Sequence, residues 1–86
     1  MTTTERAMTT AARICRLLDE KFGVPVLQFS EQITFEQLEV DSLTLVEFAL
    51  ALKKEFGITL NEAERDPSYS IIEMATLVDA KTAELR

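Results

Sequence analysis

Hydrophobic residues recur at helical spacing along most of the chain, and the pattern is most regular between Asp41 and Gly57. One set of apolar side chains in this stretch has the spacing of a buried helical stripe: Leu45, Phe48, Ala49, Leu52 and Phe56. Asp41 is a favourable N-cap, and Gly57 readily takes the left-handed conformation that ends a helix. The pattern therefore predicts a helix with well-defined ends.

A second apolar line follows a neighbouring face of the same helix and consists of Leu43, Val46 and Leu50. Glu47 lies beside this line and gives it a charged edge. A helix that is apolar over so much of its circumference is either central in a bundle or keeps one face for a partner.

Two further helices are predicted, one on each side of this stretch. The first opens with a Thr2-x-x-Glu5 capping box, ends at Gly23-Val24-Pro25, and has an apolar face of Ala7, Ala11, Ile14, Leu18 and Phe22. The last opens with a Ser70-x-x-Glu73 capping box. Its apolar face is Ile71, Met74, Ala75 and Val78, and its polar face is Asp79, Lys81 and Glu84.

The connection from residue 23 to residue 40 has no sustained periodicity, and it is long for a small domain. We expect it to pack on the helices through Val24, Ile33, Phe35 and Leu38, with one helical turn opened by a Thr34-x-x-Gln37 capping box. Asn61 caps a short turn over residues 62–65. The predicted fold is all-α: a small four-helix bundle of three main helices and one short helix, with a long loop between the first and second helices.

Composition limits the function. The 86 residues predict a single domain, 1–86, and a net charge of −6 argues against nucleic acid as a partner. No histidine is present, which excludes Ser-His-Asp catalysis and the usual zinc sites, so we expect no catalytic residues and no metal. Cys15 is the only cysteine and is expected to be a small buried residue. No membrane-spanning or signal-peptide pattern is found, so a cytoplasmic monomer that binds no membrane is expected.

Ser42 falls at the first position of the predicted central helix. It can simply belong to the helix cap, where serine is common. It can also carry a phosphate ester, because free N–H groups and a partial positive charge at a helix N-terminus suit a phosphodiester. Spacing alone does not decide between these two interpretations.

The chain resembles the acyl carrier protein family from about Ala11 to Ala80. The resemblance centres on Asp41-Ser42-Leu43, with Leu38 before it and Val46-Glu47 after it. It includes Phe22-Gly23 at the end of the first helix, Phe35-x-x-Leu38, and Phe56-Gly57-Ile58.

The resemblance implies that Ser42 receives 4′-phosphopantetheine from coenzyme A through a phosphopantetheinyl transferase. The thiol of this arm would hold an acyl group as a thioester, and the protein itself would not be an enzyme. Partner enzymes, such as an acyltransferase, a ketosynthase or an acyl- or aminoacyl-activating enzyme, would bind the surface of Asp41, Leu43, Val46, Glu47 and Leu50. A groove between the second and third helices would receive part of the acyl chain, with walls of Leu45, Ala49, Ile58, Leu60 and Ala63.

Four positions depart from the family pattern. Glu39 stands where glycine is frequent, Thr44 where an acid is common, and Lys53 and Lys54 where fatty-acid carriers commonly have acids. These departures favour a stand-alone carrier of a polyketide-type or other specialised pathway over a housekeeping fatty-acid carrier. Two alternatives stay open: a stand-alone aminoacyl or D-alanyl carrier, and an unmodified helical adaptor that binds one partner through its apolar line.

Overall fold

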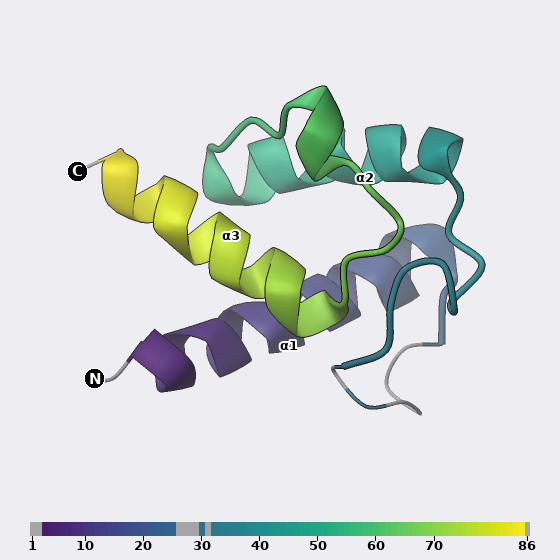
Figure 1. Cartoon of the computed structure of the whole chain (residues 1–86), viewed down its shortest axis with the longest axis horizontal. Coiled ribbons are helices and arrows are strands. Elements are labelled where there is room, and N and C mark those ends of the chain that lie inside the picture. Colours follow the sequence, from purple (N-terminus) through teal and green to yellow (C-terminus); the bar gives the residue numbers. More distant parts are fainter. Residues whose placement is uncertain (1–2, 26–29, 31, 86) are drawn as a thin grey trace.

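Three helices, α1 (Thr3–Phe22), α2 (Ser42–Phe56) and α3 (Ile71–Glu84), make up most of the computed structural model, and a short 3-10 helix, η2 (Glu62–Glu64), precedes α3. The description covers residues 3–25, 30 and 32–85, with side chains from Thr9 onwards. In Figure 1, α3 lies against α1, and α2 lies across the bundle with η2 beside it. The predicted small all-α bundle, with its long loop between the first two main helices, is confirmed.

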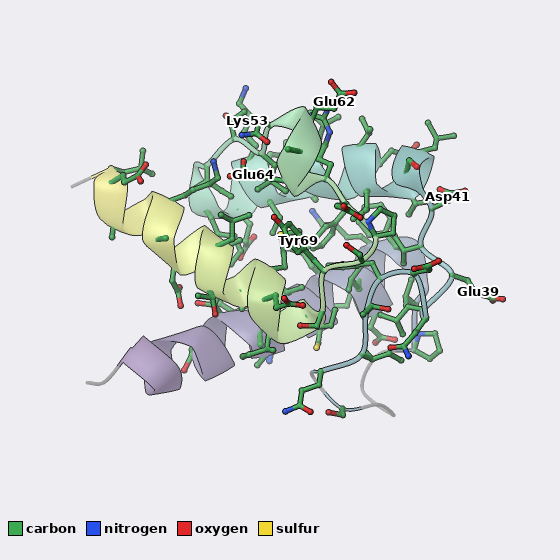
Figure 2. The ribbon with its side chains drawn as sticks, in the orientation of Figure 1. Glu39, Asp41, Lys53, Glu62, Glu64 and Tyr69 are labelled. Atoms are coloured by element: carbon green, nitrogen blue, oxygen red, sulfur yellow. The ribbon has the colours of Figure 1, made fainter. Side chains whose placement is uncertain are left out.

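The ends of α2 are set by the residues that the sequence indicated. Asp41 Oδ1 accepts a hydrogen bond from the Thr44 N–H at 2.8 Å, and Gly57 takes the left-handed conformation with φ 73° while its N–H donates to Lys53 O. Figure 2 shows Asp41 at one end of the helix and Lys53 toward the other. Gly23 ends α1 in the same left-handed way, with φ 67°, and Ser70 opens α3 with the predicted capping box. The capping box at Thr2 lies outside the described residues.

The predicted apolar stripes form one core. Leu45, Phe48 and Leu52 of α2 are fully buried, while Ala49 and Phe56 are half-buried against them. From α1 and α3 the core takes Ala11, Ile14, Leu18, Ile71, Met74, Ala75 and Val78. Cys15 is buried among them, as expected. Ala7 lies outside the described side chains.

The long loop is fastened to the start of α3. Phe35 N–H donates to Tyr69 O and Ile71 N–H donates to Ile33 O, both at 3.0 Å, on either side of an antiparallel bridge between Thr34 and Ser70. The Thr34 capping box is present in both directions, through Gln37. Phe35 is fully buried; the other three residues expected to pack, Val24, Ile33 and Leu38, are partly buried against the core. The loop is therefore a structural part of the bundle.

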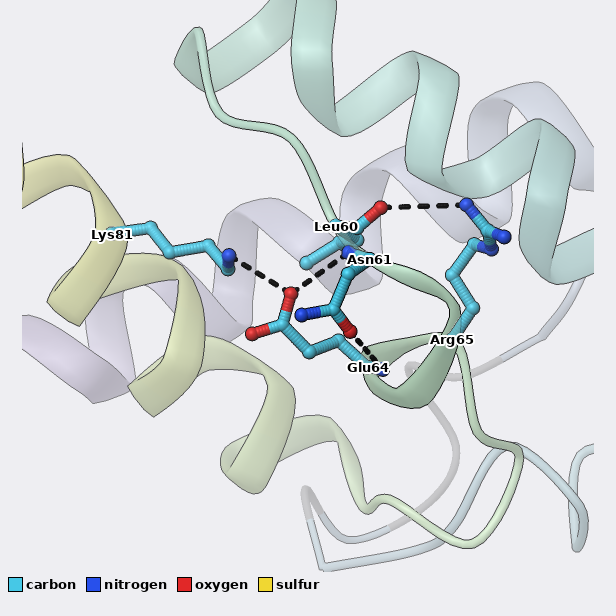
Figure 3. A network of polar contacts seen from close by, with 5 residues as sticks. All are labelled: Leu60, Asn61, Glu64, Arg65 and Lys81. Carbon is cyan, nitrogen blue, oxygen red and sulfur yellow. Dashed lines mark hydrogen bonds and ion pairs between the residues drawn. The ribbon is translucent and has the colours of Figure 1, made fainter.

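Two residues expected on the polar face of α3 contact other elements. Asp79 is half-buried between helices, where its Oδ1 accepts from Thr10 Oγ1 of α1 at 2.6 Å. Lys81 Nζ pairs with Glu64 Oε1 of η2 at 2.8 Å, and the same oxygen accepts from the Asn61 N–H (Figure 3). These contacts hold α1 and η2 against α3. No helix within the described ranges combines the length and hydrophobicity needed to cross a bilayer.

The Glu64–Lys81 pair predicts a pH dependence of stability. The hydrogen bond from Lys81 lowers the pKa of Glu64 below its ordinary value of 4.5, so this contribution to stability is complete above about pH 4.5 and is lost as pH falls through the folded-state pKa. Wild type is expected to exceed Lys81→Met in free energy of unfolding at pH 7, with the difference shrinking below pH 4.5. Urea titrations across this range measure it, and Glu64→Gln, which keeps an acceptor oxygen but cannot titrate, is the control. A difference that is constant with pH would contradict the prediction.

Candidate functional site

Ser42 is the first residue of α2, and its side chain is exposed. The capping role belongs to its neighbour: Asp41 accepts from the Thr44 N–H through its side chain and from the Leu45 N–H through its carbonyl. Among the described residues, the structure records no hydrogen bond made by the Ser42 hydroxyl. The helix end is therefore complete without the serine, whose oxygen faces solvent beside the positive end of the helix dipole.

Asp41 remains charged beside this hydroxyl. The hydrogen bond from the Thr44 N–H, with a further one from the Thr44 side chain, lowers the pKa of Asp41 below its ordinary value. A fixed negative charge thus adjoins Ser42 throughout the physiological pH range. Its carboxylate is exposed, so a partner protein can contact it.

A hollow of about 440 Å³ adjoins Ser42. It lies between the turn that precedes α2 and the segment that precedes α3, which are joined by a 2.8 Å hydrogen bond from Glu36 N–H to Pro67 O. Its lining consists of Glu36, Glu39, Val40, Asp41, Ser42, Asp66, Pro67 and Ser68. Four of these residues are acids, yet no group of metal-ligating side chains is arranged to hold an ion in the described part of the chain.

The site fits a covalent phosphopantetheine arm. The hydroxyl is accessible, Asp41 caps the helix in place of Ser42, and open space adjoins the serine. A phosphodiester at this position would meet the free N–H groups at the start of a 15-residue helix.

Glu39 has a backbone conformation that glycine adopts more easily. Its φ is 63°, and it is the one non-glycine residue of the described chain with a positive φ. This strain lies at the position where the resembled family frequently has glycine. A residue with a Cβ is destabilised by about 1–2 kcal/mol in this region. Glycine avoids this strain, but its greater conformational freedom in the unfolded state offsets part of the gain.

We expect Glu39→Gly to exceed Glu39→Ala in free energy of unfolding by about 1 kcal/mol, because both lose the carboxylate but only alanine keeps the strain. Urea unfolding monitored by circular dichroism compares the two variants directly. Equal stabilities would mean that the backbone at residue 39 relaxes at no cost.

The residues predicted to bind partners lie together on the outside. Leu43, Val46 and Leu50 are 72%, 41% and 62% exposed, and Glu47 on the same helix and Asp41 at its N-cap are also exposed. An uncovered apolar line of this kind is unusual on a small monomer and is typical of an interaction surface. The structure thus places four of the candidates on α2 and the fifth, Asp41, at its N-cap, while their role in binding stays a prediction.

The proposed acyl-chain groove receives less support. Leu45, Ile58 and Leu60 are buried in the core, Ala49 is half-buried, and Ala63 is exposed. None of these five residues lines the hollow beside Ser42. The groove therefore stays a prediction.

Sequence reasoning did not identify the far wall of the hollow. Asp66, Pro67 and Ser68 lie more than twenty positions after Ser42 and reach it through the pairing of the long loop with the start of α3. The available signal is the Asp66-Pro67 pair, because a residue before proline is pushed out of the helical region and the short helix must end there.

The sequence profile of the family "Phosphopantetheine attachment site" matches residues 12–66, more than half of the chain. Acyl carrier protein 4, chloroplastic, of Cuphea lanceolata is 28% identical over 71 residues, which are 81% of this chain and 51% of the relative. An acyl carrier protein of Thermobifida fusca strain YX is 33% identical over 48 residues, 55% of this chain and 61% of the relative.

A solved structure has the same fold. The crystal structure of an acyl carrier protein from Thermotoga maritima superposes with a TM-score of 0.81 and covers 94% of this chain and 95% of that chain, at 20% sequence identity. The chain spans about half the length of the plant relatives it matches.

Proposed function

The chain belongs to the phosphopantetheine attachment site family, that of the acyl carrier proteins, and from this premise we propose that Ser42 carries the arm. The protein is a carrier and not an enzyme, and its cofactor is covalent 4′-phosphopantetheine. When bound, this group supplies a terminal thiol that holds an acyl unit as a thioester. We further propose that residues 1–86 act as one carrier domain.

One observation carries the assignment to Ser42. Its hydroxyl is exposed at the first turn of α2, and Asp41 is the residue that caps the helix. The Ser42 oxygen therefore makes no recorded hydrogen bond that stabilises the described part of the chain. Ser42 Oγ would form the new bond to the pantetheine-bearing phosphorus of coenzyme A as that phosphorus loses its bond to the bridging diphosphate oxygen, which leaves with adenosine 3′,5′-bisphosphate. Its proton would go to a base of the transferase, because this chain has no histidine.

The charges around Ser42 bear on how the arm is presented. The helix N-terminus stabilises a phosphodiester on Ser42, whereas the carboxylates of Glu36, Glu39 and Asp66 in the hollow repel it. The attraction holds the phosphate at the start of α2, and the repulsion favours an arm that extends into solvent, where a partner can take its cargo, over an arm folded into the hollow.

The pathway is proposed from the family match and from the departures at Thr44, Lys53 and Lys54. We propose a polyketide or fatty-acid-type biosynthetic pathway, with a phosphopantetheinyl transferase and acyl-handling enzymes such as an acyltransferase or ketosynthase as partners. A carrier of aminoacyl groups is the second candidate, and an unmodified adaptor is the third. A cytoplasmic location stays a prediction, since the plant relatives are named as chloroplastic.

Mass spectrometry tests the attachment. The protein is incubated with coenzyme A, magnesium and a broad-specificity transferase, weighed intact, and then fragmented to locate the added group. We expect one phosphopantetheine on the peptide that contains Ser42. Ser68→Ala, which removes the other serine of the hollow, is the matched control and should gain the arm normally. An unmodified protein would favour the adaptor, and an arm on another serine would refute the assignment.

Val46→Asp tests the partner surface. Val46 is the middle residue of the exposed apolar line, and a charge there must be desolvated whenever a partner covers it. We expect kcat/KM of an acyltransferase or ketosynthase for the arm-bearing carrier to fall by about tenfold or more, while arm attachment persists. Ala80→Asp adds the same charge at an exposed position of α3 and should change neither reaction. Unchanged partner kinetics in Val46→Asp would count against this surface.

A further inference from the structure

The outward side of α2 carries more than the apolar line. Lys53 and Lys54 continue the spacing of Leu43, Val46, Glu47 and Leu50, so that all six residues share one helical face. All six are exposed. We call this set the outer face of α2. Its apolar half adjoins Ser42, and its basic end is the last turn of the helix.

The two ends of this face have opposite charge. The carboxylates of Glu36, Glu39, Asp41 and Asp66 gather at the hollow beside Ser42, and the two lysines lie about 18 Å away along the helix axis. Figure 2 shows Glu39 and Asp41 together at one end, well apart from Lys53. The separation exceeds a Debye length at physiological salt, so the charges at the two ends are largely screened from each other. Each end therefore interacts with a bound partner independently.

Neither lysine side chain forms an ion pair with another described residue. The ion pairs recorded among the described side chains join Arg13 to Glu55 at 2.7 Å and Lys81 to Glu64. Glu55, next to Lys54 in the sequence, is therefore directed to α1. Arg13 also lies over the ring of Phe56, 4.4 Å from its centroid, which fixes that arrangement further. The positive charge of Lys53 and Lys54 is left available to a partner.

We propose that the outer face of α2 binds a partner protein in one fixed orientation. The partner presents an apolar ridge, with cationic side chains at the end that meets Ser42 and carboxylates at the end that meets Lys53 and Lys54. The apolar line supplies affinity, and the opposed charges set the direction, because a partner bound the other way places like charges together at both ends. This inference rests on the proposed function, since it orients the partner relative to the arm on Ser42.

A second copy of the chain fits this face less well. An antiparallel pair would also bring acids to lysines, but it would place the two Glu47 carboxylates near each other and cover both copies of Ser42. The apolar line contains only three side chains, whereas stable interfaces bury about 1,200–2,000 Å². A transient contact with a partner enzyme requires less buried area than a stable dimer.

A spin-labelled peptide tests the orientation. The probe is a synthetic helical peptide with a leucine stripe, glutamates near its N-terminus, arginines near its C-terminus, and a nitroxide beside the arginines. We expect the nitroxide to broaden the amide NMR signals of residues 42–45 and to spare those of Lys53 and Lys54; moving the nitroxide to the glutamate end should reverse this. Equal broadening at both ends, broadening on another helix, or no binding would overturn the proposal. If the amide signals of α2 broaden as the protein concentration rises without peptide, the occupant is a second copy of the chain. This result would also overturn the proposal.

Paired variants separate charge position from net charge. Lys53→Glu/Lys54→Glu should weaken peptide binding about tenfold and abolish its single orientation. Arg16→Glu/Lys21→Glu makes the same change in net charge at exposed positions of α1 and should leave binding as in wild type. Both proteins should still gain the arm at Ser42 in the transferase reaction. Loss of orientation with a normal arm would thus locate the effect in docking, whereas a wild type that gains no arm refutes the proposed function itself. Equal effects of the two pairs would refute the charge-oriented docking.

Discussion

Ser42→Ala is expected to abolish arm attachment completely and to leave the free energy of unfolding within about 0.5 kcal/mol of wild type. The first effect follows because alanine has no oxygen to form the phosphodiester. The second follows because the Ser42 side chain is exposed, has no recorded hydrogen bond in the described structure, and lies in a first helical turn that Asp41 caps. The two results together distinguish a site of modification from a structural residue.

The measurements are intact mass after the transferase reaction, and urea unfolding and thermal unfolding of the unmodified protein. Asp41→Ala provides the contrast, because it removes the oxygen that accepts from the Thr44 N–H and should lower the melting temperature. An arm on Ser42→Ala would show that another residue is modified. A melting temperature many degrees below that of wild type in Ser42→Ala would show that the hydroxyl supports the fold.

The sequence predicted those features that depend on near neighbours. The cap at Asp41, the left-handed turn at Gly57 and the capping boxes at Thr34 and Ser70 each involve residues within four positions of one another, and all four are present. The division of α2 into a buried stripe and an exposed line was also predictable. Both follow from the helical period alone, which fixes the relative direction of side chains.

Features built from distant segments were not predictable in this way. The hollow depends on the hydrogen bond between Glu36 and Pro67, and η2 is held by Lys81, far along the chain. Asp79 has the spacing of a solvated residue, yet it accepts from Thr10. Composition and period specify which face of a helix is apolar, but they do not specify which polar residue of one helix meets another. The resemblance to a known family indicated the site; the charged surroundings of Ser42 came from the structure.

The strained residue Glu39 connects the core to the site. Its turn follows the buried Phe35, whose carbonyl accepts from the Val40 N–H at 2.9 Å and whose ring packs on Phe48 of α2. The position of the loop before Ser42 therefore depends on aromatic packing beneath it. A change in the core should be felt at the attachment site as well as in global stability.

Phe48→Ala should produce the largest loss of stability of the changes considered, about 3–5 kcal/mol. Phe48 is fully buried, and its ring packs on Phe22 of α1 with centroids 6.0 Å apart and on Phe35 of the loop at 5.6 Å. Removing it leaves a cavity where three segments meet, and the aromatic pairs are lost with it. Small domains are stable by about 5–15 kcal/mol, so the variant should unfold at a much lower urea concentration.

Urea titration followed by circular dichroism measures this loss, and Leu50→Ala is the matched control. Leu50 is on the same helix but 62% exposed, so its truncation should cost no more than about 0.5 kcal/mol. Because the Phe35 turn leads to Ser42, the rate of arm attachment to Phe48→Ala should also fall below that of wild type under conditions where both are folded. Similar stabilities in the two variants would mean that the stripe through Phe48 is not the centre of the core. A large stability loss with an unchanged attachment rate would mean that the loop holds its position without that ring.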